Sequence, residues 1–335
     1  MRVVKSVAVE DFEVRGSIKD SDVARLVRAF SDDPHISEGE AEALLRLNKS
    51  CPVQAPSWSG FLVDAIADYI LNQSGQEGYI TVEKSGWLIG RLSSGGWISN
   101  RAELDLVVAV VGRARWFPLS LATFVLEQVA GAVVHGFGPL RPVYAAGPMA
   151  GAVPGSIAAG EIGLIRHILS AFGGESAIAL TRPEVEILAG VNRAVSARGA
   201  PPAAWTDLFA KVIANVVLAE HGYAVPPRAV ALQPRMMENG TESVAQHVAQ
   251  CLGNLRRVYH RSSGEERALA RLERQRIEIV TGEAVPSPDA GWLTARLALS
   301  ARLSAVEAGV LAHLSAECLI GDDWKDEIVR ASHAA

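Results

Sequence analysis

The sequence predicts an all-α protein built from two related halves, each made of helix–loop–helix units. Three observations support this prediction. Apolar residues make up 49% of the 335-residue chain and aromatic residues only 6%, and alanine, the strongest helix former, is frequent. Apolar positions recur with helical spacing, as in "DVARLVRAF", where Val23, Leu26, Val27 and Phe30 share one face. Spaced residues also repeat between the first and second halves of the chain.

The repetition consists of two blocks that occur in the same order in each half. In the first block, residues 40, 44 and 48 match residues 144 positions later, and residues 58 and 66 match residues 147 positions later. In the second block the offset is 205. The matching pairs are Glu40 and Glu184, Leu44 and Leu188, Asn48 and Asn192, Trp58 and Trp205, Ile66 and Ile213, Trp87 and Trp292, Arg91 and Arg296, and Leu92 and Leu297. We therefore predict a tandem duplication with a large insertion in the second half.

Four segments follow one plan, in which an amphipathic helix and a short loop precede the Ser or Thr and the Glu that open the next helix. The segments are residues 22–48, 82–111, 160–192 and 289–317. A hydroxyl side chain at such a position accepts a hydrogen bond from a free amide of the first turn. We predict that these helices are capped by Ser37, Ser99, Thr181 and Ser304. Further helices are expected to begin near residues 58 and 205 and to run through residues 120–134.

The chain is predicted to have four parts. Residues 1–20 form an N-terminal extension with weak strand character, and residues 21–136 form the first helical half. Residues 137–159 are rich in Gly, Pro and Ala, which is typical of a linker. Residues 160–335 form the second half, with a charged helical insertion at about 226–288.

The stretches "GGWISNRAEL" and "ISEGEAEALL" resemble the loop-to-helix joint of EF-hand-like proteins and of the tellurite-resistance TerB-like helical domains. This resemblance covers short segments and implies tandem helix–loop–helix halves of a degenerate EF-hand-like or TerB-like kind. It implies a metal site only where the oxygen ligands are present, since calcium takes six to eight of them. The first loop offers Asp32, Asp33, Glu38 and Glu40 as weak candidates. Calcium is therefore the one cofactor kept as a possibility, and helix capping is the favoured role of Glu40.

Charge and cysteine content narrow the classes of function. A formal net charge of -5 gives no general attraction to nucleic acid or to an anionic membrane. The three cysteines, Cys51, Cys251 and Cys318, are widely spaced and odd in number, as expected of reduced thiols in the cytoplasm. We expect no signal peptide in the first residues, because Lys5, Glu10 and Asp11 interrupt the apolar run, and the apolar residues 143–160 contain too many glycines and prolines for a membrane span.

Two features are not explained by the duplication and are the predicted sites for a protein partner. One is Trp97, which follows two glycines in a turn and belongs to a residue type enriched in binding hot spots. The other is the arginine-rich part of the insertion, with Arg256, Arg257, Tyr259 and Arg261 as candidates. Further along, glutamates alternate with arginines, which favours a solvent-exposed helix over a nucleic-acid surface.

The sequence thus favours a non-catalytic cytoplasmic protein that acts through protein–protein contact, as a scaffold or regulatory adaptor. One alternative is a calcium sensor whose first loop still binds the ion. A second alternative is an enzyme with a cleft between the two halves. No catalytic or cofactor-binding residue is predicted from spacing.

Overall fold

The computed structural model describes residues 3–4, 7–140, 153–234, 243–286, 292, 303–317 and 319. The all-α prediction is confirmed, since helices account for most of these residues. Most of the predicted linker and the start of the predicted helical segment 289–317 lie outside the described residues, as does Cys318.

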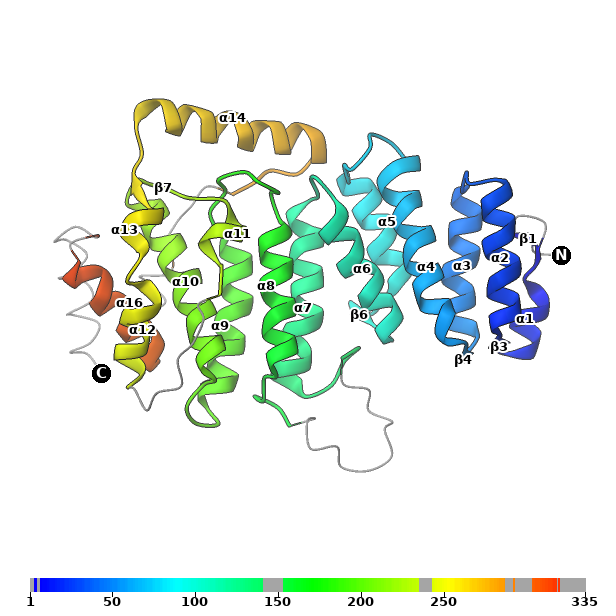
Figure 1. The fold of residues 1–335 in the computed structure, drawn as a ribbon, viewed down its shortest axis with the longest axis horizontal. Coiled ribbons are helices and arrows are strands. Elements are labelled where there is room, and N and C mark those ends of the chain that lie inside the picture. The colour runs from blue at the N-terminus through cyan, green and yellow to red at the C-terminus, as the bar shows by residue number, and fades with distance from the viewer. Residues whose placement is uncertain are drawn as a thin grey trace.

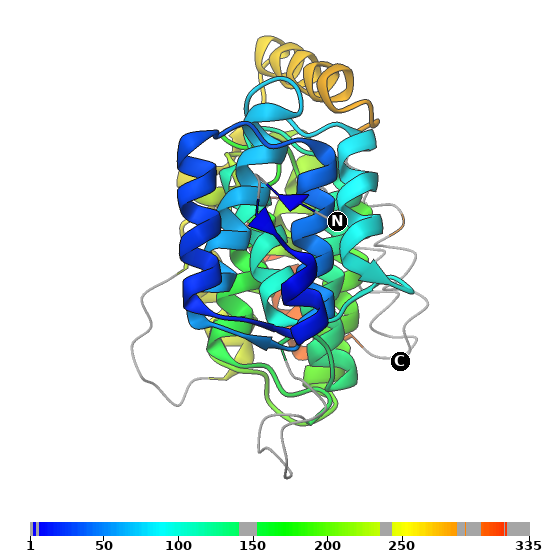
Figure 2. The ribbon, with the colours of Figure 1, turned by 90° about the vertical axis from the view of Figure 1, so that its right-hand side faces the viewer.

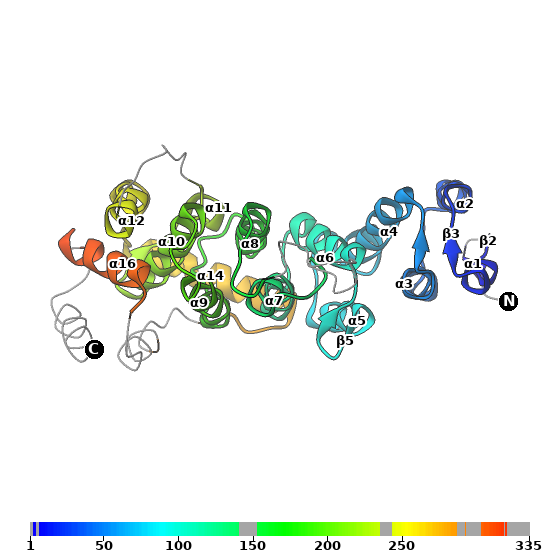
Figure 3. The same cartoon turned by 90° about the horizontal axis from the view of Figure 1, so that it is seen from below.

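The helices stand side by side in an elongated array, with α1 at one end and α12 and α16 at the other (Figure 1). Successive helices alternate between two layers, which are seen end-on in Figure 3. One layer contains α1 (Glu10–Arg15), α3 (Glu38–Ser50), α5 (Val82–Leu92), α7 (Leu119–His135) and α9 (Arg182–Ser196). The other contains α2 (Asp20–Asp32), α4 (Pro56–Asp68), α6 (Arg101–Arg113), α8 (Ala159–Ala171), α10 (Ala203–Glu220) and α12 (Val244–Leu252).

The remaining elements are short or lie outside the layers. A π-helical turn, η1 (Tyr69–Gln73), extends α4, and α16 (Ala305–Ala316) packs on α10 and α12. The insertion also contains α11 (Arg228–Ala231), α13 (Leu255–Val258) and α14 (Gly264–Thr281). Four two-stranded pairs are formed by β1 (Val3–Val4) with β2 (Val7–Ala8), β3 (Ser17–Ile18) with β4 (Val53–Gln54), β5 (Ser93–Ser94) with β6 (Trp97–Ile98), and β7 (Tyr223–Ala224) with β8 (His260–Arg261).

The array is continuous across the predicted linker, because α7 packs on both α8 and α9. Phe117, before α7, meets Phe172, after α8, edge to face at 5.6 Å. At the N-terminus, α1 buries Phe12, so part of the predicted extension 1–20 belongs to the array. The division of the chain into four parts stays a prediction.

The helix starts follow the predicted capping with one correction. Ser37 and Ser304 each accept a hydrogen bond from the amide of the glutamate three residues on, and Thr181 forms a capping box with Glu184. The predicted cap Ser99 is wrong by one residue, since Asn100 caps α6 and accepts from the amide of Glu103 at 3.0 Å. Asn and Ser are about equally favoured as N-caps, because the side-chain oxygen of either can accept from a free amide of the first turn.

A buried contact recurs between residues that match in the repeat. The indole Nε1 of Trp58 donates to Oδ1 of Asn48 at 3.0 Å, and that of Trp205 donates to Oδ1 of Asn192 at 3.2 Å. Both tryptophans are fully buried, so the asparagine supplies the acceptor that an indole N–H needs inside a core. The duplication itself stays a prediction.

Candidate functional site

Helix α14 stands apart from the two layers and crosses the upper ends of the helices between α10 and α7 (Figure 1). Figure 2, seen from the N-terminal end of the array, shows it above the stacked helices. Its start is a capping box, in which Ser263 accepts from the amide of Glu266 at 3.1 Å and donates its own amide to that carboxylate at 2.8 Å. Its end is Gly282, whose left-handed conformation stops the helix.

Both ends of α14 are fixed to the array. Before it, β8 pairs with β7, and the hydroxyl of Ser262 donates to the carbonyl of Gly222 at 2.8 Å. After it, the carboxylate of Glu283 accepts from the backbone amide and hydroxyl of Ser120 in the first turn of α7, at 3.1 and 3.0 Å. A carboxylate is favoured there because the amides of a first turn are free and the helix dipole is positive. Between these two attachments, Ile277 of α14 is buried in the hydrophobic core.

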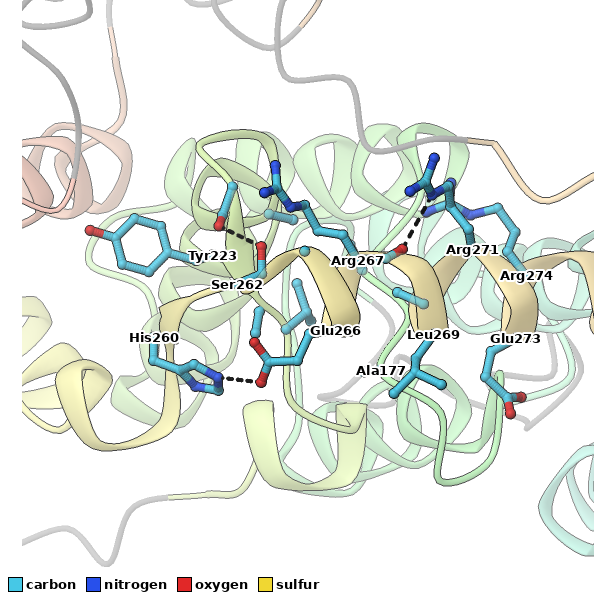
Figure 4. Close-up of a pocket in the computed structure, with 17 residues that line it drawn as sticks. Ala177, Tyr223, His260, Ser262, Glu266, Arg267, Leu269, Arg271, Glu273 and Arg274 are labelled. Atoms are coloured by element: carbon cyan, nitrogen blue, oxygen red, sulfur yellow. Dashed lines mark hydrogen bonds and ion pairs between the residues drawn. The ribbon is translucent and has the colours of Figure 1, made fainter.

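A cavity of about 750 Å³ lies between α14 and the array; we call it the α14 cavity. Small side chains form its array side, among them Ala177, Ala179 and Ala219. Leu269 and Ala270 line it from α14. Figure 4 shows Leu269 beside Ala177, and Leu269 is 56% exposed because nothing in the described chain covers it there.

Charged side chains of α14 form the rim of this cavity. Figure 4 places Arg267, Arg271 and Arg274 on one side of the helix and Glu266 and Glu273 on the other. The Nε atoms of Arg267 and Arg271 donate to backbone carbonyls of the preceding turn, at 3.3 and 3.4 Å. Among the described residues, neither of these two guanidinium groups lies within ion-pair distance of a carboxylate.

The rim carboxylates are already bound by neighbours. Glu266 accepts from the backbone amide of Ser263 and pairs with Nε2 of His260 at 2.7 Å, and these two contacts lower the pKa of Glu266. Glu273 accepts from the hydroxyl of Ser176 at 3.4 Å. These contacts hold the two carboxylates on their own side of the helix, and with three arginines against two glutamates the net formal charge of the rim is positive.

The side of α14 that points away from the array carries an apolar seam. Ala268, Leu272, Gln275 and Ile279 are all exposed and follow the alternating spacing of four and three that places residues on one helix face. We call these four residues the outer face of α14. Leu272 is 60% exposed and Ile279 is 82% exposed, which leaves two large side chains in water.

The predicted partner residues of the insertion lie near the start of α14 and differ in exposure. Arg256 donates to the backbone carbonyl of Glu317 at 2.8 Å, and Arg261 lies over the Tyr223 ring. Arg257 is exposed. Tyr259 is only 4% exposed, and its hydroxyl accepts from Nδ2 of Asn215 at 2.9 Å. Burial raises the pKa of Tyr259 and makes this side chain part of the core rather than of a partner surface.

Trp97 lies at the opposite edge of the array from α14, in the hairpin of β5 and β6 (Figure 1). Gly95 and Gly96 both have positive φ, which the two-residue turn requires. Trp97 is 37% exposed, and its ring packs against Gly131 and edge to face against His135 at 6.2 Å. The indole is thus half covered by α7.

The four weak calcium candidates do not form one cluster of free carboxylates. Asp32 is the last residue of α2, and Asp33 ends that helix. Glu38 and Glu40 lie in the first turn of α3, where Glu40 accepts from the amide and hydroxyl of Ser37. Within the described ranges, no group of three or more His, Cys, Asp or Glu side chains is arranged to hold a metal ion.

A buried ion pair between Arg228 and Glu184 was not predicted from the sequence. Arg228, fully buried on α11, donates to both carboxylate oxygens of Glu184, at 2.6 and 2.9 Å. Its remaining N–H groups donate to the carbonyls of Leu169, Ile178 and Ala179. This guanidinium therefore fixes the loop that forms the array side of the α14 cavity.

No known protein family, curated protein or solved structure matches the chain. In the described residues, no helix has the length and apolar character that crossing a bilayer would need.

Proposed function

We propose that this protein is a non-catalytic cytoplasmic adaptor that binds another polypeptide through the outer face of α14. The observation that carries the proposal is the exposure of Leu272 and Ile279 on a helix fixed at both ends to the array. Covering two such side chains releases about 1.5–3 kcal/mol each, and a fixed helix loses little entropy when it is bound.

An amphipathic helix is the partner that fits this face. The residues of the outer face are spaced as in the seam of two packed helices, where apolar side chains of one helix enter spaces on the other. Glu265 and Arg276 flank the seam near its two ends, so a partner helix with the opposite order of charges is favoured. Trp97 and Phe137, which is 44% exposed, offer a second and smaller contact surface at the other edge of the array.

Site-specific photo-crosslinking tests the proposal. A photoreactive amino acid is placed at position 272 of the full chain, and a matched control carries it at position 193, an exposed site on α9. We expect a specific polypeptide adduct in lysate of the source cells at position 272, absent at position 193 and lost with Ile279→Asp. Identical adduct patterns at the two positions, or no adduct at position 272, would show that the outer face is not a docking surface.

A further inference from the structure

We propose that the α14 cavity binds an amphiphilic anion, meaning a molecule with one long hydrocarbon chain and a carboxylate or phosphate at its end. This inference goes beyond the proposed adaptor function, since it concerns the inner side of α14 and needs no partner protein. It rests on the size of the cavity, its apolar walls and two rim arginines, Arg267 and Arg271, that have no carboxylate within ion-pair distance among the described residues.

The size of the cavity suits a small molecule. About 750 Å³ lies within the range of about 300–1,000 Å³ that is typical of ligand pockets. The part of α14 that covers the cavity runs from Gly264 to Arg274, which corresponds to about 15 Å at the rise of an α-helix.

The walls favour a hydrocarbon over a polar ligand. Ala177, Ala179 and Ala219 contribute methyl groups to the lining, and Leu269 contributes a larger apolar side chain from α14. Figure 4 places Leu269 on the same side of α14 as Glu273, near Ala177, and 56% of this leucine is exposed to solvent. A hydrocarbon chain in the cavity would cover this leucine and the alanines together.

The rim supplies the charge selectivity. Arg267 and Arg271 lie on one side of α14 and have no carboxylate partner in the described chain, whereas Glu266 and Glu273 accept hydrogen bonds from His260 and Ser176. Guanidinium groups bind carboxylate and phosphate oxygens with two parallel N–H donors. The charged end of the ligand is thus expected beside the two arginines, with its chain running under the helix toward Ala177.

A fluorescent long-chain fatty acid tests this assignment on the full chain. Binding of cis-parinaric acid is followed by its emission, below the concentration at which it forms micelles, and competition compares hexadecanoate with hexadecanol. We expect saturable binding that hexadecanoate displaces better than hexadecanol. Binding should weaken at high salt, because the rim arginines are exposed to solvent.

Variants identify the site. Ala177→Phe fills the cavity from an exposed loop position, and Arg267→Gln with Arg271→Gln removes the rim charge; each should weaken binding about tenfold. Arg257→Gln is the matched control, because it removes an exposed arginine outside the cavity lining. Circular dichroism of each variant verifies the fold.

The outcomes distinguish a free ligand from a lipid surface. Absence of saturable binding, or equal affinity in wild type, Ala177→Phe and the double arginine variant, overturns the proposal. Sedimentation with phosphatidylglycerol vesicles without binding of the free acid also overturns it, since a bilayer surface does not fit under α14. None of these measurements involves position 272. A negative result for the ligand therefore does not contradict the adaptor proposal, which the crosslinking experiment tests.

Discussion

Replacement of Arg228 by methionine should be among the most damaging single changes to this fold. The guanidinium is fully buried and makes two hydrogen bonds to Glu184 and three to backbone carbonyls, at distances between 2.6 and 3.2 Å. Methionine fills similar space but donates nothing. The carboxylate of Glu184 would keep only the hydrogen bonds it accepts from Thr181.

The magnitude follows from the groups left without partners. Removing one member of a buried ion pair costs about 3–5 kcal/mol, because the other charge stays in a medium of low polarity. Each carbonyl that loses its donor adds up to about 1–3 kcal/mol, less where the loop relaxes toward water. We therefore expect Arg228→Met to lower the free energy of unfolding by at least about 4 kcal/mol.

The double variant Arg228→Met with Glu184→Gln separates charge from packing. A neutral amide at position 184 still accepts from the amide of Thr181 but leaves no buried charge, so the double variant should be more stable than Arg228→Met alone. Urea unfolding followed by circular dichroism measures the free energies. Hydrogen exchange at residues 177–185 then localises the loss, because regions of a protein can open locally with free energies below that of global unfolding.

Arg257→Met is the control, since replacing an exposed surface side chain should change the free energy of unfolding by no more than about 0.5 kcal/mol. A loss below about 1 kcal/mol for Arg228→Met would refute the reasoning. It would mean that water reaches Glu184 and the loop carbonyls once the arginine is gone.

Three further predictions concern other buried contacts. Burial raises the pKa of Glu103, so the folded protein keeps a proton that the unfolded chain loses, and the free energy of unfolding falls as pH rises above the ordinary pKa of a glutamate. Glu103→Gln should flatten this fall in urea unfolding measured from about pH 4 upward, and parallel curves for the variant and the wild type would count against it. Asn48→Ala and Asn192→Ala should each cost about 1–3 kcal/mol in the same assay by orphaning a buried indole N–H, and a loss at only one position would mean that the contacts are not equivalent. Gly131→Ala places a carbon inside the contact distance of the Trp97 ring, so the emission of Trp97 should shift to longer wavelength; an unshifted spectrum, measured as the difference from Trp97→Phe, would contradict this packing.

The features that sequence predicted best are local ones. A capping box links residues three positions apart, so Ser37 with Glu40 and Ser304 with Glu307 mark helix starts without any knowledge of the fold. The error at Ser99 arose because the next residue, Asn100, is an equally good cap. Which of the two residues caps α6 depends on where the β5–β6 hairpin ends and the helix begins, and the pairing of the hairpin sets that boundary.

The features that sequence could not give are contacts between distant positions. Arg228 lies on the short helix α11, and no neighbouring residue in the sequence indicates that its guanidinium binds the carboxylate of Glu184, 44 residues earlier. Tyr259 lies among arginines in the sequence, as is typical of a surface residue, yet its side chain is buried and its hydroxyl accepts a hydrogen bond from Asn215. Alternating charges predicted that α14 is exposed, but its position over the array depends on Glu283 and Ser120, 163 residues apart.

The attachment of α14 at two distant places has a mechanical consequence. The strand before it, β8, pairs with β7 after α10, and Glu283 after it is hydrogen-bonded to the first turn of α7. Helix α14 therefore connects two distant parts of the array and spans the helix–helix contacts between them. Helices that contact mainly their neighbours bend at each joint, and small rotations add up along the array. The length of α14 is fixed by its backbone hydrogen bonds. Bending of the array between α7 and α10 must therefore either weaken the contacts at one end of α14 or change the width of the α14 cavity.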